Sequence, residues 1–500
     1  MLLSTVIFLP LIGAAVIMLL MKDPARIRVW ALGVTVVELM LAVVVFCLFR
    51  SSDSQQLGGM EMVEQYGTWI SSLDISYHVG VDGLSAPLVL LTALLGMCAV
   101  FASWGVQLRV REYFIWLLLL QTAVTGVFLS LDFVLFFIFW ELELLPMYFL
   151  ISVWGGGRKE YSAMKFLIFT LLGSAFMLVG ILAIYFSVGT FNIVELPNMM
   201  ENATLILPAG TIFMLLFIAF AVKLPVWPVH TWLPDAHTDA PTAVSVMLAG
   251  VLLKMGGYGM IRMAIGIMPD QAQKFAGFMA VIAIISVLYG AVVTIRQTDL
   301  KRLVAFSSIS HMGYVLLGIS SVLGAGGVVS GVGLTGAAMQ MFTHGTITGL
   351  LFLLVGLVYD KAHTRHIPDL GGLAARMPIV AVGFLVAGLA SLGLPGTSGF
   401  VAELLVFLGA FKVWSWITAL AVFAIVITAG YILWMLQRAF FGPLQPRFAS
   451  IGDATVIEAV PMVILVVAIM LVGVYPSIVL DVFRSGIDPI IYSLQQVAGG

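Results

Sequence analysis

Residues 209–237 read AGTIFMLLFIAFAVKLPVWPVHTWLPDAH, an apolar run that ends in a lysine and is followed by three prolines. The run up to Lys223 has the composition of a membrane-spanning helix. Pro225, Pro228 and Pro234 lack the backbone N–H that a continuing helix requires. The stretch therefore predicts a membrane helix that is broken in its middle. Lys223 ends the first half, where the helix dipole and free carbonyl groups favour a cation.

A second break is predicted in the C-terminal half of the chain. Leu394-Pro395-Gly396, followed by Gly399, interrupts an otherwise apolar stretch. Broken helices at corresponding places in two halves indicate an inverted-repeat transporter, whose ion site lies near the bilayer midplane. Two ordinary proline kinks are the simpler alternative.

The composition of the whole chain is that of a membrane protein. Of its 500 residues, 61% are hydrophobic and 10% are charged, whereas soluble domains are roughly half apolar and a quarter charged. A net charge of -2 without a basic face or stripe argues against nucleic acid, which leaves lipid and other membrane subunits as partners. Cys47 and Cys98 stand in apolar runs without a second ligand at metal spacing, so we interpret them as packing residues and expect no iron–sulfur cluster.

Fourteen apolar stretches of about twenty residues are long enough to cross a membrane. They cover residues 2–21, 29–49, 85–104, 112–129, 131–152, 162–188, 209–229, 240–266, 275–295, 303–323, 332–358, 376–411, 415–440 and 457–480. We therefore expect an all-α integral membrane protein with about 14 transmembrane helices, of which helices 7 and 12 are broken. The expected domains are N-terminal helices 1–3 (1–111), two inverted five-helix repeats with helices 4–8 (112–266) and helices 9–13 (267–441), and C-terminal helix 14 (442–500).

Charged residues in the loops predict the orientation of the chain. Sixteen lysines and arginines fall in loops on one side of the predicted membrane, and five fall on the other. Because positively charged loops stay in the cytoplasm, the first side is cytoplasmic and both termini are external. Two lysines, Lys223 and Lys254, are left inside the membrane.

Six ionisable residues fall at membrane depth within the predicted helices. They are Glu38, Glu141, Glu143, Lys223, Lys254 and Glu403. Because each such group costs about 3 kcal/mol to insert, each calls for a reason. A structural ion pair would explain any one of them, but six together favour transport. Lys254 lies in mid-span beside Gly256 and Gly257, which allow a neighbouring helix or water to approach.

The four glutamates have different expected environments. Glu141 and Glu143 are two residues apart, so on a helix they point about 200° apart and cannot both face one cavity. One is expected on a proton path, and the other pairs with a different helix or subunit. Glu403 follows the second break without a basic residue in its own segment, so it is protonated, hydrated or paired across helices. Glu38 is expected to form an interhelical hydrogen bond.

Histidines at membrane depth complete the predicted chemistry. His311 stands among serines and His344 follows Thr343. A lone buried histidine is usually a satisfied core residue, but an imidazole can accept a proton on one nitrogen and donate from the other. With lysines and glutamates in neighbouring spans, we interpret these two as a relay. His230 and His237 flank the first break near the cytoplasmic side.

Five motifs together resemble the antiporter-like subunits of respiratory complex I, and the similarity spans nearly the whole chain. The motifs are Trp140–Tyr148, Val222–His237, Ala240–Ser245, Leu300–Gly313 and Leu394–Glu403. The family divides into chains 2, 4 and 5, with relatives in multisubunit sodium/proton antiporters and membrane-bound hydrogenases. Glu403 on the twelfth helix is similar to the chain 4 (subunit M) group, because chains 2 and 5 typically carry lysine there.

The resemblance implies roles for the site residues. It implies that Glu141 and Lys223 form an ion pair that gates proton uptake, and that Lys254 is the central carrier. His311 and His344 would continue the hydrated axis, and Glu403 would be the exit residue. The expected function is proton translocation coupled to quinone reduction, performed by a non-redox subunit of a proton-translocating NADH–quinone oxidoreductase.

The resemblance also implies partners, cofactors and location. We expect neighbouring antiporter-like subunits as partners, no cofactor in this chain, and flavin, iron–sulfur clusters and quinone in other subunits. The expected location is the inner (plasma) membrane, or a thylakoid-type membrane. Glu143 is similar to chloroplast and cyanobacterial forms that use ferredoxin, whereas Ala240–Thr242 resembles the respiratory bacterial form, so the electron donor stays open. The alternatives are a subunit of a multisubunit cation/proton antiporter or hydrogenase, and a structural spacer.

Overall fold

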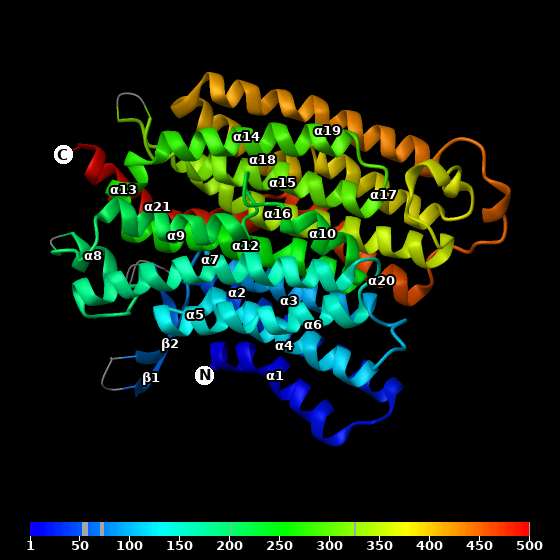
Figure 1. Ribbon diagram of the computed structural model, residues 1–500, viewed down its shortest axis with the longest axis horizontal. Helices are drawn as coiled ribbons and strands as arrows, with labels where there is room; N and C mark the ends of the chain where they lie inside the picture. The colour runs from blue at the N-terminus through cyan, green and yellow to red at the C-terminus, as the bar shows by residue number, and fades with distance from the viewer. Residues whose placement is uncertain (53–58, 71–74, 202, 325–326, 500) are drawn as a thin grey trace.

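The computed structural model describes residues 1–52, 59–70, 75–201, 203–324 and 327–499, and it is a bundle of long, roughly aligned helices (Figure 1). The N-terminal helix α1 lies at one edge of the bundle in this view. Helices α14 and α19 lie at the opposite edge, and α9, α12 and α16 lie between (Figure 1). The architecture is the predicted all-α membrane protein.

Twelve helical segments in the described part of the chain are long and apolar enough to cross a membrane. They are α1 (Leu2–Leu20), α2 (Pro24–Ser51), α3 (Ser85–Ala102), α4 (Val110–Leu129), α5 with α6 (Phe133–Leu142 and Leu144–Trp154), α7 (Lys159–Val188), α11 to η2 (Thr242–Ile265), α14 (Ala276–Ile295), α15 (Leu300–Ile319), α16 (Gly331–Ala362), α19 (Trp416–Phe440) and α20 (Val456–Val474). The two remaining predicted spans are the broken helices. All fourteen predicted spans are therefore present.

Both predicted breaks are confirmed. Helix α9 (Ala209–Lys223) ends at the lysine, and the chain becomes helical again only in α10 (Trp232–Asp239). Helix α17 (Pro378–Ser391) is separated in the same way from α18 (Ser398–Trp414). Prolines that cannot continue the helical hydrogen bonding explain both interruptions.

The broken helices are the fourth spans of two successive groups of five, α4 to η2 and α14 to α19. Because five is an odd number of crossings, the second group begins on the opposite face of the membrane and is inverted relative to the first. The exact residues at which the four predicted domains divide stay a prediction.

The interior of the bundle is formed by three spans that are buried almost throughout. The most apolar windows of Thr242–Ile265 and Gly331–Ala362 are 100% buried, and that of Leu300–Ile319 is 94% buried. The first of these contains α11 (Thr242–Met247) and α12 (Leu253–Gly259), each followed by a π-helical turn, η1 (Leu248–Leu252) and η2 (Met260–Ile265). These three spans carry Lys254, His344 and His311.

Two elements outside the membrane helices were not predicted. Strands β1 (Glu61–Ile70) and β2 (Ile75–Val81) form an antiparallel hairpin between α2 and α3. The predicted last span, 457–480, ends instead at Val474, and a separate helix α21 (Ser477–Gly499) follows. Helix α21 buries one face, which includes Phe483 and Ile487. Short helices α8 (Leu196–Met200) and α13 (Pro269–Lys274) lie in loops.

Candidate functional site

Lys223 is buried at the end of α9, where the first break begins. Its ammonium group forms an ion pair with Glu143, which is also buried. The rings of Trp140 and Phe166 face the same ammonium, with centroids 5.3 and 5.6 Å from Nζ. The Trp232 indole donates a hydrogen bond of 2.9 Å to the Val222 carbonyl and so satisfies a backbone acceptor that the break exposes.

The resemblance implies an ion pair of Lys223 with Glu141, whereas the structure pairs Lys223 directly with Glu143; the role of Glu141 stays a prediction. The direct partner of Lys223 is Glu143, and Glu141 forms no ion pair within the described residues. Pro146 explains the difference, because it has no N–H to donate to the Leu142 carbonyl, and the helix is interrupted at Glu143. This interruption lets Glu143 point inward.

Glu141 lies nearer the outer wall of the chain. It is half-buried, and it shares a helical stripe with Ile138 and Leu145, which are 37% and 49% exposed. One oxygen of its carboxylate is buried without a hydrogen-bond partner among the described groups. The prediction that the two glutamates face different ways is confirmed. Glu143, and not Glu141, is the one that faces Lys223.

Lys254 lies at the centre of the eighth span, between its two π-helical turns. Its ammonium group donates to the Ala249 carbonyl, and Nζ lies 2.8 Å from Nδ1 of His344. Such π-helical turns appear frequently at functional sites. A side-chain carbon on Gly256 would lie 2.5 Å from the Leu224 backbone nitrogen, so this glycine lets α12 pack directly against the first break.

His344 and His311 continue the row of buried groups from α16 to α15. The two imidazole centroids are 5.5 Å apart. Nδ1 of His311 lies 3.3 Å from Oε1 of Glu403, and its Nε2 lies 3.2 Å from the Ser391 hydroxyl. Of the three alternatives expected for Glu403, protonated, hydrated or paired across helices, the structure shows a contact across helices with His311.

The second break shapes the surroundings of Glu403. Gly393 has φ +76°, a backbone conformation that a side chain disfavours. A side-chain carbon there would lie 2.7 Å from Oε2 of Glu403. The glycine therefore allows both the turn of the broken helix and the close approach of the carboxylate.

Four groups thus form one buried row that runs from the first repeat into the second. They are Lys254 on α12, His344 on α16, His311 on α15 and Glu403 on α18. Each can bind and release a proton. Lys223 does not contact this row through any described group.

Two further buried polar groups lie outside this row. His237 is completely buried, stacks on Phe352 at 4.4 Å, and has no described hydrogen-bond partner on either ring nitrogen. The motif around it was recognised, but its burial depends on a residue far along the chain. Glu38 accepts a hydrogen bond of 2.5 Å from the Gln121 amide. This is the interhelical bond that was predicted for Glu38.

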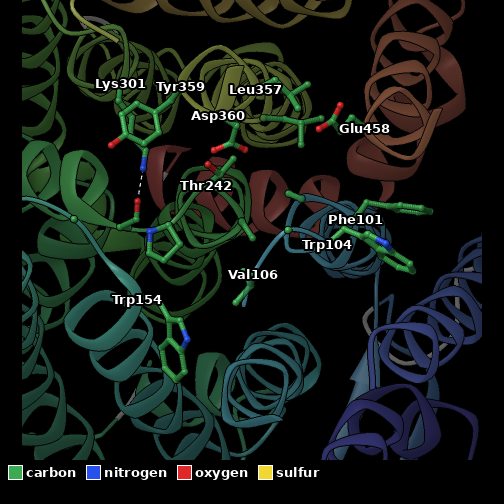
Figure 2. Close-up of a pocket in the computed structure, with 18 of the residues that line it drawn as sticks. Phe101, Trp104, Val106, Trp154, Thr242, Lys301, Leu357, Tyr359, Asp360 and Glu458 are labelled. Carbon is green, nitrogen blue, oxygen red and sulfur yellow. Dashed lines mark hydrogen bonds between the residues drawn. The ribbon is translucent and has the colours of Figure 1, made fainter. Parts of the chain in front are cut away.

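A cavity of about 810 Å³ opens where α3, α6, α10 and α16 end and α20 begins. Figure 2 shows Lys301, Asp360 and Glu458 along one edge of it and Trp154 at the opposite edge. Lys301 donates a hydrogen bond to the Ala240 carbonyl, drawn as a dashed line. The cavity also reaches Thr238 and Asp239, the residues that directly follow His237. Its loops are on the side predicted to be cytoplasmic.

No set of three histidine, cysteine, aspartate or glutamate side chains gathers as metal ligands within the described ranges. The chemistry that the site itself offers is acid–base chemistry along a buried row, next to an ion pair in a broken helix.

The chain is similar to known membrane subunits along nearly its whole length. Residues 130–428 match the family model described as NADH:quinone oxidoreductase/Mrp antiporter, TM. NADH-quinone oxidoreductase subunit M of Rhodobacter capsulatus is 42% identical, over 96% of this chain and 94% of the relative. NAD(P)H-quinone oxidoreductase chain 4 of Gloeobacter violaceus is 39% identical, over 97% and 92%.

Two solved structures have the same fold. A chain of respiratory complex I from Thermus thermophilus with bound NADH matches with a TM-score of 0.87 and 28% identity, and the match covers 100% of both chains. A chain of the Mrp complex from a Dietzia species matches with a TM-score of 0.85 and 22% identity, also over 100% of both.

Proposed function

This chain belongs to the NADH:quinone oxidoreductase/Mrp antiporter family of transmembrane proteins, and we propose that it is the proton-translocating subunit M (chain 4) of a complex I-type enzyme. Other subunits carry the flavin, the iron–sulfur clusters and the quinone. This chain contributes a proton path through the membrane. Its partners are the neighbouring membrane-arm subunits.

The observation that carries the proposal is the buried row of Lys254, His344, His311 and Glu403. An amine, two imidazoles and a carboxylic acid succeed one another within direct or near-direct contact. Each of these four proton-exchanging groups costs free energy to bury at membrane depth. A row that only stabilised the fold would not need four of them in the three most buried spans and α18. Lys254 is the central carrier, and Glu403 releases the proton on the external side.

The cytoplasmic cavity supplies the uptake side of the path. It holds room for water between Lys301 and Asp360, and it ends beside the residues that follow His237. From there a proton reaches the row at Lys254 or His344. The external position of both termini and the plasma-membrane location follow from the loop charges and are part of this proposal.

The ion pair of Lys223 and Glu143 supplies the control. Two unit charges about 4 Å apart interact by about 4 kcal/mol at an effective dielectric constant of 20. A charge change in a neighbouring subunit that opens or closes this pair changes the potential at Lys254 and moves its proton toward Glu403. Glu141 lies within the electrostatic range of Lys223 and belongs to the same control element.

A subunit of a stand-alone cation/proton antiporter is a weaker proposal. Identity of 22% to the Mrp complex supports the common fold alone, whereas subunit M of Rhodobacter capsulatus is 42% identical. A passive spacer does not explain the buried row.

The test is Lys254→Arg in the assembled enzyme. Arginine keeps the positive charge and stays protonated at all relevant pH values. We expect an intact complex on native gels but a loss of proton pumping by inverted membrane vesicles. Lys274→Arg, at an exposed position, is the matched control. Pumping by Lys254→Arg at the wild-type rate would remove Lys254 from the path, and purified complexes without redox subunits would contradict the complex I assignment.

A further inference from the structure

One buried ammonium group in this chain has two carboxylates within reach. Lys223 pairs directly with Glu143, and Glu141 lies close enough for its charge and that of Lys223 to act on each other. Among the described residues, one positive charge stands against two acidic groups. One of the two glutamates is therefore always without a cation.

The two carboxylates occupy unequal positions. Glu143 is completely buried at the interruption between α5 and α6. Glu141 is half-buried on the stripe of Ile138 and Leu145. Each of the two carboxylates has one oxygen without a described hydrogen-bond partner. An acid in this setting without a cation binds a proton instead of staying ionised. The structure thus shows Lys223 paired with Glu143, while Glu141 is hydrogen-bonded to Ser174 and forms no ion pair with any described residue.

The space around the ammonium group allows it to move between these partners. The rings of Trp140 and Phe166 lie 5.3 and 5.6 Å from Nζ. Aromatic faces attract a cation from any direction across the ring, without the fixed geometry of a hydrogen bond. They can therefore hold Lys223 while it is bound to neither carboxylate.

We propose that Lys223 alternates between two carboxylates, with Glu143 as the inner partner at rest and Glu141 as the outer partner. The pair that controls the proton path is then a two-position switch, and Lys223 is never left as a bare buried charge. This inference deepens the proposed function. Its consequence for pumping rests on that function, whereas the exchange of partners does not.

The exchange is balanced in protons. When the ammonium group leaves Glu143 for Glu141, Glu141 releases the proton it held and Glu143 binds one. The ammonium group keeps its own three protons. The charge of the site is the same in both positions, and only its location shifts between the inner and the outer wall. That shift changes the potential at Lys254 without the cost of breaking a buried pair.

Dicyclohexylcarbodiimide distinguishes the two positions in the assembled enzyme. It enters apolar membrane regions and forms a stable adduct with protonated carboxyl groups, but not with ionised, paired ones. Tandem mass spectrometry of the segment around Leu142 assigns the adduct to Glu141 or Glu143. At rest, we expect modification of Glu141 and little of Glu143.

The decisive variant is Glu143→Gln, which keeps the shape of the side chain and removes its charge. Lys223 should then pair with Glu141, and the modification of Glu141 should fall about tenfold, as expected for one charge-assisted hydrogen bond. Lys223→Gln should have the opposite effect, because it frees both carboxylates for modification. Glu38→Gln, another buried glutamate in a membrane span that does not contact Lys223, is the matched control and should leave the pattern unchanged.

Unchanged or increased modification of Glu141 in Glu143→Gln would overturn the exchange of partners, as would the absence of Glu141 modification in the wild-type enzyme. If Glu143→Gln does not assemble, Glu143→Asp replaces it. The shorter acid should hold Lys223 less well and lower the Glu141 adduct partly, and no change would again refute the proposal. The labelling needs no proton pumping. A pattern that shifts as expected in a variant that still pumps normally would therefore refute the control role and leave the exchange intact.

Discussion

Glu403→Gln tests the external end of the proton path most directly. Oε1 of Glu403 lies 3.3 Å from Nδ1 of His311, whose other nitrogen lies 3.2 Å from the Ser391 hydroxyl. Glutamine keeps the size of the side chain and one hydrogen bond, but it can neither ionise nor pass on a proton. The substitution therefore changes the chemistry of this position with little change in packing.

The size of the effect follows from this one contact. A hydrogen bond to a charged partner contributes about 1.5–3 kcal/mol, which is a factor of roughly ten to one hundred in an equilibrium constant. In addition, the exit group itself is lost. We expect pumping driven by NADH or by ferredoxin to fall at least about tenfold, with the complex fully assembled.

The assay is acidification of inverted membrane vesicles, measured by fluorescence quenching and normalised to the amount of assembled complex. Glu112→Gln, an exposed glutamate at the start of α4, is the matched control and should pump normally. Normal pumping by Glu403→Gln would refute the reasoning. Glu403 would then be structural, and the exit would pass through His344 and its hydroxyl neighbours.

Three further substitutions test how the site is built. Gly393→Ala should impair pumping and lower stability by about 1–3 kcal/mol, because Gly393 has a positive φ and the added carbon would lie 2.7 Å from Oε2 of Glu403. Thermal unfolding and vesicle acidification measure the two effects. Gly430→Ala, where the added carbon would meet no other atom within 4 Å, is the control. Glu38→Gln should pump normally, because glutamine can still accept the Gln121 hydrogen bond, so a strong loss would place Glu38 on the path. Glu38→Leu should lower thermal stability by about 1–3 kcal/mol, because it leaves the buried amide of Gln121 unpaired, and an unchanged melting temperature would contradict this.

The spans and breaks could be predicted because their signals are local. A bilayer of fixed thickness requires about twenty apolar residues per helix, and proline disrupts a helix wherever it stands. The strands β1 and β2 were missed because each is shorter than a membrane span, although Ile75, Tyr77, Val79 and Val81 alternate with polar or small residues as in a strand. Helix α21 was joined to the last span because the apolar residues that begin it follow closely after Val474.

The site residues could be named from the sequence, but their contacts could not. The pairing of His311 with Glu403 joins residues that are far apart in the chain, and so does the stacking of His237 on Phe352. For Glu141 and Glu143, helical geometry established that they face different ways. Which one faces inward depends on the interruption at Glu143, and an uninterrupted helix was the wrong basis for that choice.

Both backbone breaks lie beside ionisable groups, and there is a physical reason for this. A continuous membrane helix satisfies its own carbonyl and amide groups and offers nothing to a charge. At the first break, the exposed end of α9 holds Lys223, and at the second, the turn at Gly393 approaches Glu403. Between them, the Ala249 carbonyl in the π-helical turn before Lys254 accepts from its ammonium group. Each irregularity of the backbone thus lies beside an ionisable group of the proposed proton path at membrane depth.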